Sequence, residues 1–211
     1  MEQKSEEWLQ LRKGKFTGSE IWKLLVEPRN KTELFSDTTK SYIFEKIAEE
    51  VSTESPERFV TTAMQWGNDF ESLAKKWYSK LSGNIITEIP FIHHPIHSAN
   101  VGGSPDGYIE SNNSIIEIKC PYNPSNHIKH ILCNAENMKS ELKEYYWQMQ
   151  FYIECMKAEY CDFISFDPRV NEDWGLHIKR VERNDSDIQL MNDKIKQSLA
   201  YKEQIINKLK P

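Results

Sequence analysis

The spacing of apolar residues along the chain predicts a mixture of helices and strands. The clearest stripe recurs at helical spacing from Phe59 to Leu81 and ends near Gly83, which predicts a long helix with one buried face. Other stripes and short alternating runs predict helices over 5–13, 17–27, 37–51 and 141–156 and at the C-terminus, and strands over 84–92, 160–166 and 176–181. With no internal repeat and no linker, residues 1–211 are expected to form a single α/β domain, a central mixed β-sheet flanked by helices.

The segment Gly102–Tyr122 predicts a hairpin, two short strands around a polar turn at 111–114. Because strand side chains alternate, Glu117 and Lys119 share one face, while the isoleucines on either side of Glu117 face the core. A pairing that brings Asp106 alongside Glu117 would place two carboxylates and one ammonium in a small volume.

Two carboxylates this close repel each other unless a cation lies between them. A hard divalent ion such as Mg²⁺ suits carboxylate oxygens and leaves positions for water and a phosphate, and Mn²⁺ is accepted by the same ligands. Lys119 would position the attacking water and help to deprotonate it, or neutralise charge that develops at phosphorus. The constellation predicts metal-assisted phosphodiester hydrolysis, against the plainer alternative of a hairpin with solvated charges.

Composition narrows the class of protein. The formal net charge of −5 is unusual for a protein that binds DNA, so its 27 Lys and Arg residues would have to concentrate in a cleft or channel. The four cysteines show no C-x-x-C spacing, which argues against zinc, an iron–sulfur cluster or a disulfide framework. The apolar runs are too short to span a bilayer and the first residues lack a signal-peptide pattern, so a cytoplasmic protein is expected.

Polar residues beside the helical stripes are the remaining candidates. Thr17 and Glu20 have capping-box spacing, so Ser19 and the free amides of that first turn form a potential anion site near Arg12; a simple helix start is the alternative. Glu71 lies on the flank of the long stripe, where it either faces the hairpin or is solvated.

Seven short motifs, spread over nearly the whole chain, resemble the bacteriophage lambda exonuclease type, the phage recombination exonucleases of the restriction-endonuclease-like superfamily. The hairpin is similar to the P-D…E-x-K motif of that superfamily. The matching stretches are W-x-x-L-R-x-G-x-x-T-x-S-E at Trp8–Glu20, W-G-x-x-x-E at Trp66–Glu71, S-P-D-G at Ser104–Gly107, E-I-K-C-P at Glu117–Pro121, Q-M-Q at Gln148–Gln150, D-P-R at Asp167–Arg169 and G-L-H at Gly175–His177.

The resemblance implies a Mg²⁺-dependent exonuclease that degrades the 5′-phosphorylated strand of linear duplex DNA to mononucleotides. Asp106, Glu117 and the carbonyl of Ile118 would be metal ligands, Lys119 would act on the water, and Glu71 would hold metal-bound water. The residues implied to bind the terminal 5′-phosphate are Arg12, Ser19, Ser104 and Gln148.

Two further roles and the partners follow from the same resemblance. Met64 stands where the family has a leucine wedge that separates the strands, and Arg29 matches a residue that touches the duplex. A homotrimeric ring around the DNA, a single-strand annealing protein as partner, and the bacterial host cytoplasm are implied. A restriction-like or resolvase endonuclease and a catalytically inactive protein that binds DNA ends are the alternatives.

Overall fold

The computed structural model describes residues 5–53 and 60–210, and these form two compact units. The first unit contains residues 5–53, 90–104 and 184–210, and the second contains 60–89 and 105–183. The single domain expected over 1–211 stays a prediction. None of the described helices is both long enough and apolar enough to cross a membrane.

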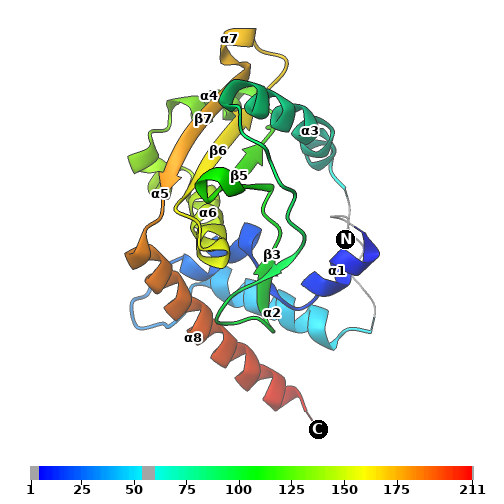
Figure 1. Cartoon of the computed structure of the whole chain (residues 1–211). Coiled ribbons are helices and arrows are strands. Elements are labelled where there is room, and N and C mark those ends of the chain that lie inside the picture. The colour runs from blue at the N-terminus through cyan, green and yellow to red at the C-terminus, as the bar shows by residue number, and fades with distance from the viewer. Residues whose placement is uncertain (1–4, 54–59, 211) are drawn as a thin grey trace. The chain divides into compact units, whose positions relative to one another are not determined.

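The first unit packs three helices and a 3₁₀ helix with a small sheet. Its sheet has the order β1-β3-β2, with β1 parallel and β2 antiparallel to β3. Side-chain caps start its helices, since Ser36 accepts from the amide of Thr39 and Asn184 from that of Asp187. The elements are α1 (Glu6–Arg12), β1 (Phe16–Thr17), the 3₁₀ helix Gly18–Leu25, α2 (Asp37–Val51), β2 (Ile92–His93), β3 (Val101–Gly103) and α8 (Asp185–Leu209) (Figure 1).

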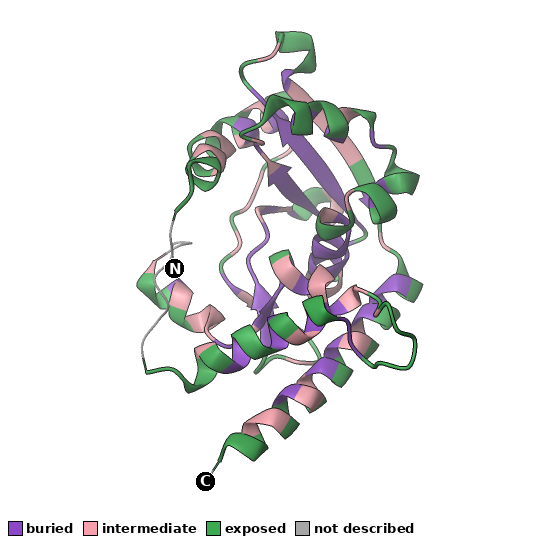
Figure 2. Cartoon of the chain, turned by 180° about the vertical axis from the view of Figure 1, so that it is seen from behind, coloured by how far each residue is buried: buried purple, intermediate pink, exposed green. Residues whose placement is uncertain are grey.

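The second unit is built on a mixed four-stranded sheet of order β4-β5-β6-β7. The β4–β5 and β6–β7 pairs are antiparallel and the central β5–β6 pair is parallel, and both central strands are buried along nearly their whole length (Figure 2). The elements are α3 (Thr62–Ser82), β4 (Gly107–Ile109), the 3₁₀ turn Glu110–Asn112, β5 (Ser114–Lys119), α4 (Pro124–Leu132), the 3₁₀ turn Ala135–Asn137, α5 (Met138–Glu141), α6 (Lys143–Met156), β6 (Tyr160–Phe166), α7 (Glu172–Gly175) and β7 (Leu176–Glu182).

One face of this sheet is apolar and packs against α3. Ile116 and Ile118 of β5 and Ile164 of β6 join Ala74 and Tyr78 of the helix in a single buried cluster. Apolar burial of this kind is the main favourable term in folding. The helix ends at Gly83, which adopts φ 73°, a conformation that glycine reaches without strain.

The opposite face of the sheet lies under α4 and α6, and here charged and polar side chains stand among apolar ones such as Phe163. Side chains alternate along a strand, so the residues between the core isoleucines, Glu117 and Lys119, face these two helices instead. Hydrogen bonds join Ser165 of β6 to α4, and Lys119 of β5 lies within 3.4 Å of Gln148 on α6. The candidate chemistry therefore lies on the face that the apolar core does not use.

Most of the predicted elements are confirmed, including the hairpin, the mixed sheet and the helix over 37–51. The strand predicted over 84–92 is wrong, because this segment makes only one isolated bridge, between Thr87 and Tyr108, before β2 begins. The alternating apolar residues were misleading here, since Ile85 is 83% exposed. Phe59, at the start of the long stripe, lies outside the described residues.

Two local expectations are also corrected. The capping box at Thr17 is wrong: Thr17 belongs to β1, its side chain makes no cap hydrogen bond, and the helix that follows is a 3₁₀ helix. Its amide donates instead to the hydroxyl of Tyr42 at 3.0 Å. The apolar stripe of the helix over 37–51 also predicts that Val51 faces inward; this is wrong, since Val51, the last residue of α2, is 58% exposed.

Gly107 is the position where the hairpin tolerates a side chain least. A Cβ there would lie 2.4 Å from Cγ2 of Ile86 and 3.0 Å from Cδ1 of Ile116. We expect Gly107→Ala to lower the free energy of unfolding by about 1–3 kcal/mol, the usual cost of overpacking. Urea unfolding measures this. Gly67→Ala is the matched control, because a Cβ at Gly67 meets no atom within 4 Å and alanine favours a helix by about 1 kcal/mol. Equal stability of Gly107→Ala and the wild type would contradict the packing described here.

Candidate active site

The β4–β5 pairing brings the two predicted carboxylates together. Gly107 pairs with Ile116, so the next residues outward, Asp106 and Glu117, face each other across the mouth of the hairpin. Oδ2 of Asp106 accepts a hydrogen bond from the amide of Ile118 at 2.7 Å, which ties the loop before β4 to β5. The geometry expected from the sequence is confirmed.

Burial and mutual repulsion dominate the electrostatics of this pair. Burial, reinforced by the nearby charge of Asp106, raises the pKa of Glu117 to about 8. Burial also raises the pKa of Asp106, and the charge of Glu71 adds to that rise. Burial would lower the pKa of Lys119, but the attraction of Glu117 and Asp106 outweighs it and raises that pKa, so the ammonium form is held.

The ammonium of Lys119 is surrounded by three groups of the second unit. Nζ donates to Oε1 of Glu117 at 2.5 Å and lies 3.4 Å from Oε1 of Gln148. It also lies 5.0 Å from the centre of the Tyr145 ring, within the range of a cation–π contact. Gln148, which was predicted to be partly buried, is buried.

The residues present fit a hard divalent cation better than a zinc cluster. Oε2 of Glu117 is buried and has no hydrogen-bond partner among the described residues, so it is available as a ligand. The N–H and the C=O of one strand residue point to the same side of the strand. The amide of Ile118 bonds to Asp106, so the carbonyl of Ile118 also points to the Asp106 side. Within residues 5–53 and 60–210 no group of three or more His, Cys, Asp or Glu side chains is placed to hold a metal. Two carboxylates and a carbonyl are a ligand set typical of Mg²⁺, which keeps several waters.

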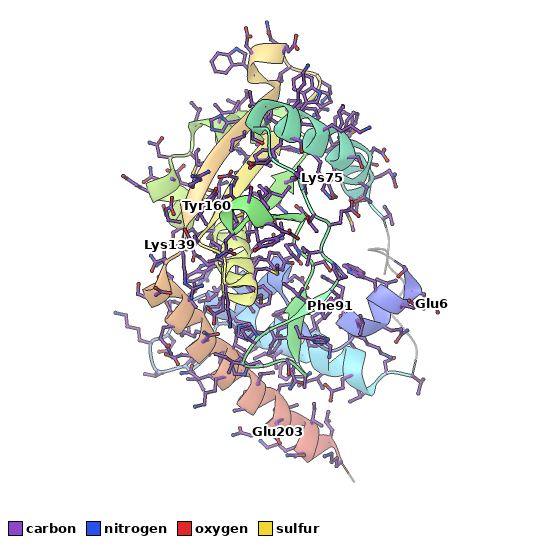
Figure 3. The ribbon with its side chains drawn as sticks, viewed as in Figure 1. Glu6, Lys75, Phe91, Lys139, Tyr160 and Glu203 are labelled. Atoms are coloured by element: carbon purple, nitrogen blue, oxygen red, sulfur yellow. The ribbon has the colours of Figure 1, made fainter. Side chains whose placement is uncertain are left out.

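Glu71 reaches the hairpin from α3. Its Oε1 pairs with Nζ of Lys75, one turn further along the helix, at 3.0 Å. Lys75, labelled in Figure 3, thus compensates one acidic side chain of the site. Glu71 lies near enough to raise the pKa values of both Asp106 and Glu117, so of its two predicted positions the structure supports the one facing the hairpin.

Three of the four residues predicted to bind phosphate cluster in the first unit around Trp8. The guanidinium of Arg12 lies 4.3 Å from the centre of the Trp8 ring, and the indole N–H donates to Oγ of Ser104 at 2.9 Å. Nη2 of Arg12 donates to Oγ of Ser19 at 3.5 Å. Indole and guanidinium groups only donate, so both serine hydroxyls accept here and keep their own hydrogens for another acceptor. The cluster has the chemistry of an anion site.

The other predicted contact residues belong to different elements of the chain. Gln148 belongs to the second unit, beside Lys119. Met64 lies in the first turn of α3 and is 52% exposed, and Arg29 is exposed in the connection between the 3₁₀ helix and α2. The roles of these residues stay predictions.

Sequence reasoning missed two residues of these clusters. Tyr145 was assigned to an apolar stripe, yet its ring meets the ammonium of Lys119. Its position three residues before Gln148 was the available signal, because residues three apart share a helix face. Trp8 appears in the sequence analysis only as the first residue of the Trp8–Glu20 motif. Its place one helical turn before Arg12 was the available signal for that contact, but nothing local indicates its bond to Ser104.

Comparisons with known proteins find exonucleases that share this fold. The structure is similar to that of an alkaline exonuclease from Laribacter hongkongensis, with 31% identity, a TM-score of 0.82, and coverage of 97% of this chain and 96% of that one. The same figures apply to that exonuclease in complex with dAMP. A phage related exonuclease from Haemophilus somnus 129PT shares the fold, with 19% identity, a TM-score of 0.76, and coverage of 96% and 99%. No curated protein sequence matches the chain.

Fold and hairpin together define a restriction-endonuclease-like core of the lambda exonuclease type, as the sequence predicts. The model of the YqaJ-like viral recombinase domain matches residues 7–159. The chain belongs to that family.

The raised pKa of Glu117 makes the stability of the metal-free protein depend on pH. Between the ordinary pKa of 4.5 and the raised value of about 8, the folded protein keeps a proton that the unfolded chain has released. The free energy of unfolding should therefore fall as pH rises through this window, by about 1 kcal/mol or more. A divalent cation, which favours the ionised carboxylate, should oppose the fall.

Urea unfolding between pH 5 and pH 8, with EDTA or with Mg²⁺, measures this dependence. Glu117→Gln carries no ionisable group there and should flatten the metal-free profile, whereas Glu159→Gln, at an exposed position, should retain it. A Glu117→Gln profile as steep as that of the wild type would contradict the assigned burial.

Proposed function

We propose that this protein is a Mg²⁺-dependent exonuclease that degrades linear double-stranded DNA from a 5′-phosphorylated end. It releases mononucleotides and leaves a 3′ single-stranded tail for recombination by single-strand annealing. The observation that carries the proposal is the cluster formed by Asp106, directly before β4, with Lys119 and the buried Glu117 of β5. Membership of a viral recombinase family supports it, as does similarity to an alkaline exonuclease that has been seen with a mononucleotide, dAMP.

The chain supplies ligands, orientation and charge. Asp106, Glu117 and the Ile118 carbonyl would hold the cation, which supplies Lewis-acid polarisation of the scissile phosphate. Of the two roles left open for Lys119, the electrostatic one is proposed. A protonated Nζ orients the attacking water by hydrogen bonding and stabilises negative charge that develops at phosphorus, but it does not accept the proton. The Glu71 carboxylate, also at this end of the hairpin, is a hydrogen-bond acceptor for a second water.

Selection of the 5′ end is assigned to the Trp8 cluster. Arg12 provides a permanent positive charge with several donors, and Ser19 and Ser104 each retain a hydroxyl hydrogen to donate. A terminal phosphate monoester carries more charge than an internal diester, so this set favours it over a 5′-hydroxyl end. The contribution of Gln148 to the same phosphate stays a prediction from the resemblance.

The remaining roles follow the family resemblance. Met64, exposed at the start of α3, is proposed as the wedge that separates the strands, and Arg29 as a contact to the duplex. A homotrimeric ring would keep the DNA bound topologically, which suits a chain with a net charge of −5. A single-strand annealing protein is the proposed partner in the bacterial cytoplasm.

Three substrates test the activity directly: a linear duplex with 5′-phosphate ends, the same duplex with 5′-hydroxyl ends, and a covalently closed circle. With Mg²⁺ we expect mononucleotides from the first, few from the second and none from the circle, and none of these with EDTA. Lys119→Ala should lower turnover on the first substrate by at least about 100-fold, because it removes a preorganised charge at phosphorus. Its affinity for DNA, measured by gel shift with Ca²⁺, should persist.

The matched control is Lys80→Ala, which removes an exposed lysine of α3 and should leave turnover unchanged. Cutting of the circle would replace the proposal with the endonuclease alternative. Tight binding to DNA ends with no hydrolysis of any substrate would favour the inactive end-binding protein. Near wild-type turnover in Lys119→Ala would rule out the role given to this lysine.

Arg12→Ala should remove the preference for a phosphorylated end. The expected decrease is about 10-fold or more in kcat/KM on 5′-phosphate duplex, with little change on 5′-hydroxyl duplex, because the variant has no charge-assisted hydrogen bond to the phosphate. Initial rates on the two duplexes measure this. Lys13→Ala, the neighbouring cation, whose ammonium is bonded to the carbonyl of Ser52, is the control and should keep the preference. Equal slowing on both ends would contradict the phosphate site.

A further inference from the structure

The face of the second sheet under α4 and α6 carries a row of side chains that begins at Lys119 and continues into residues that the proposed reaction does not use. Lys119 of β5 pairs in register with Ser165 of β6, and Ser165 pairs with His177 of β7. Residues paired in register point to the same face, so these three side chains stand in one row. Ser165 is fully buried, one strand away from the ammonium of Lys119.

Ser165 is the centre of a hydrogen-bonded chain with two histidines of α4. Its Oγ lies 2.7 Å from Nδ1 of His127 and 2.9 Å from Nδ1 of His130. Nε2 of His127 lies 2.8 Å from the carbonyl oxygen of Trp174, at α7. Both histidines are buried.

The chemistry of the partners assigns the hydrogens along this chain. A carbonyl oxygen only accepts, so Nε2 of His127 donates to Trp174, and in a neutral imidazole Nδ1 of His127 then accepts from the hydroxyl of Ser165. Oγ of Ser165 in turn accepts from Nδ1 of His130. Burial lowers the pKa of His130 to about 4, so its ring is neutral near pH 7 and this donor is available. The chain therefore fixes the orientation of the His130 ring.

The His130 ring in turn confines the ring of Tyr145 on α6. The two rings meet edge to face, with centroids 5.5 Å apart and an interplanar angle of 89°. On another side Tyr145 stacks on Phe163, at 5.6 Å and 26°, and Phe163 also meets His130 edge to face at 5.4 Å. Three rings in mutual contact leave the Tyr145 ring little freedom, with its face directed at Nζ of Lys119.

We propose that Tyr145 is a positioning residue for Lys119, and that the chain of His127, Ser165 and His130 holds the Tyr145 ring in place for that task. The proposal rests on the proposed function, because it assumes that the ammonium of Lys119 acts at the scissile phosphate. Of the three groups around Nζ, Glu117 is a proposed metal ligand and Gln148 a proposed phosphate contact, so the ring face is the one with no other proposed partner. The ring therefore restrains the ammonium when the carboxylate is engaged elsewhere.

Two other roles for the hydrogen-bonded chain of His127, Ser165 and His130 fit the structure less well. Ser165 is not a nucleophile, because it is fully buried and its hydroxyl hydrogen is already donated to His127. Simple core packing does not require polar groups here, since burying them costs free energy that apolar residues avoid. Positioning of the Tyr145 ring by His127, Ser165 and His130 explains why polar groups are buried here.

Steady-state digestion of the 5′-phosphate duplex by Tyr145 variants tests the proposal. Tyr145→Phe keeps the ring face and should retain kcat within about 2-fold. Tyr145→Leu removes the ring and should lower kcat by about 10-fold with KM nearly unchanged, the size expected when a cation–π interaction is removed at a partly buried site. Tyr145→Met, which fills more of the volume without a π face, should behave like Tyr145→Leu and provides a second variant if leucine impairs folding. Ser165→Ala, which breaks the chain behind the ring, should lower kcat by about 3-fold.

The same variants in the Lys119→Ala background separate this proposal from the function it rests on. If both hold, Tyr145→Leu causes no further decrease once Lys119 is absent. Wild-type kcat in both Tyr145→Leu and Tyr145→Met, with Lys119→Ala inactive, would overturn the positioning role alone. A decrease of kcat in Tyr145→Phe equal to that in Tyr145→Leu would also overturn it, since the hydroxyl and not the ring would then matter. Full activity of Lys119→Ala would overturn the proposed function and this inference together.

Discussion

The second unit is organised around one constraint. Asp106 and Glu117 are two carboxylates removed from water at the mouth of one hairpin, and they repel each other. Two buried like charges are costly unless neighbouring groups offset them. The amide of Ile118 and the ammonium of Lys119 offset part of this cost, and Oε2 of Glu117 is left without a partner among the described residues. A divalent cation bound between the two carboxylates would relieve the repulsion that remains.

The sheet can hold these carboxylates because its two faces carry different residues. Against α3, the isoleucines of β5 and β6 form an apolar core that fixes the register of the hairpin. Under α4 and α6, the alternate residues carry the charges and the polar chain around Ser165. A shift of one residue would exchange the two faces, so burial of the isoleucines is also what aims Glu117 and Lys119.

The basic side chains described here interact with groups close to them. Lys46 and Lys202 are buried in ion pairs with glutamates of the same unit, so these two cations are used within the fold. The first unit nevertheless sets Arg12 against Trp8, with two serine hydroxyls nearby. A small set of oriented donors can recognise a phosphate without a strongly basic chain, which reconciles the net charge of −5 with a DNA substrate.

The sequence by itself determined the hairpin, the faces of Glu117 and Lys119, and most helices, because the two-residue period of a strand and the helical period are local properties. Only the tertiary structure decided that Thr17 pairs in a strand instead of capping a helix, and that residues 84–92 make a single bridge. It also decided that Tyr145 faces an ammonium and that Trp8 joins Arg12 to Ser104. The bond of Trp8 to Ser104 spans 96 positions and the contact of Tyr145 with Lys119 spans 26, and no local period encodes which distant group will be met.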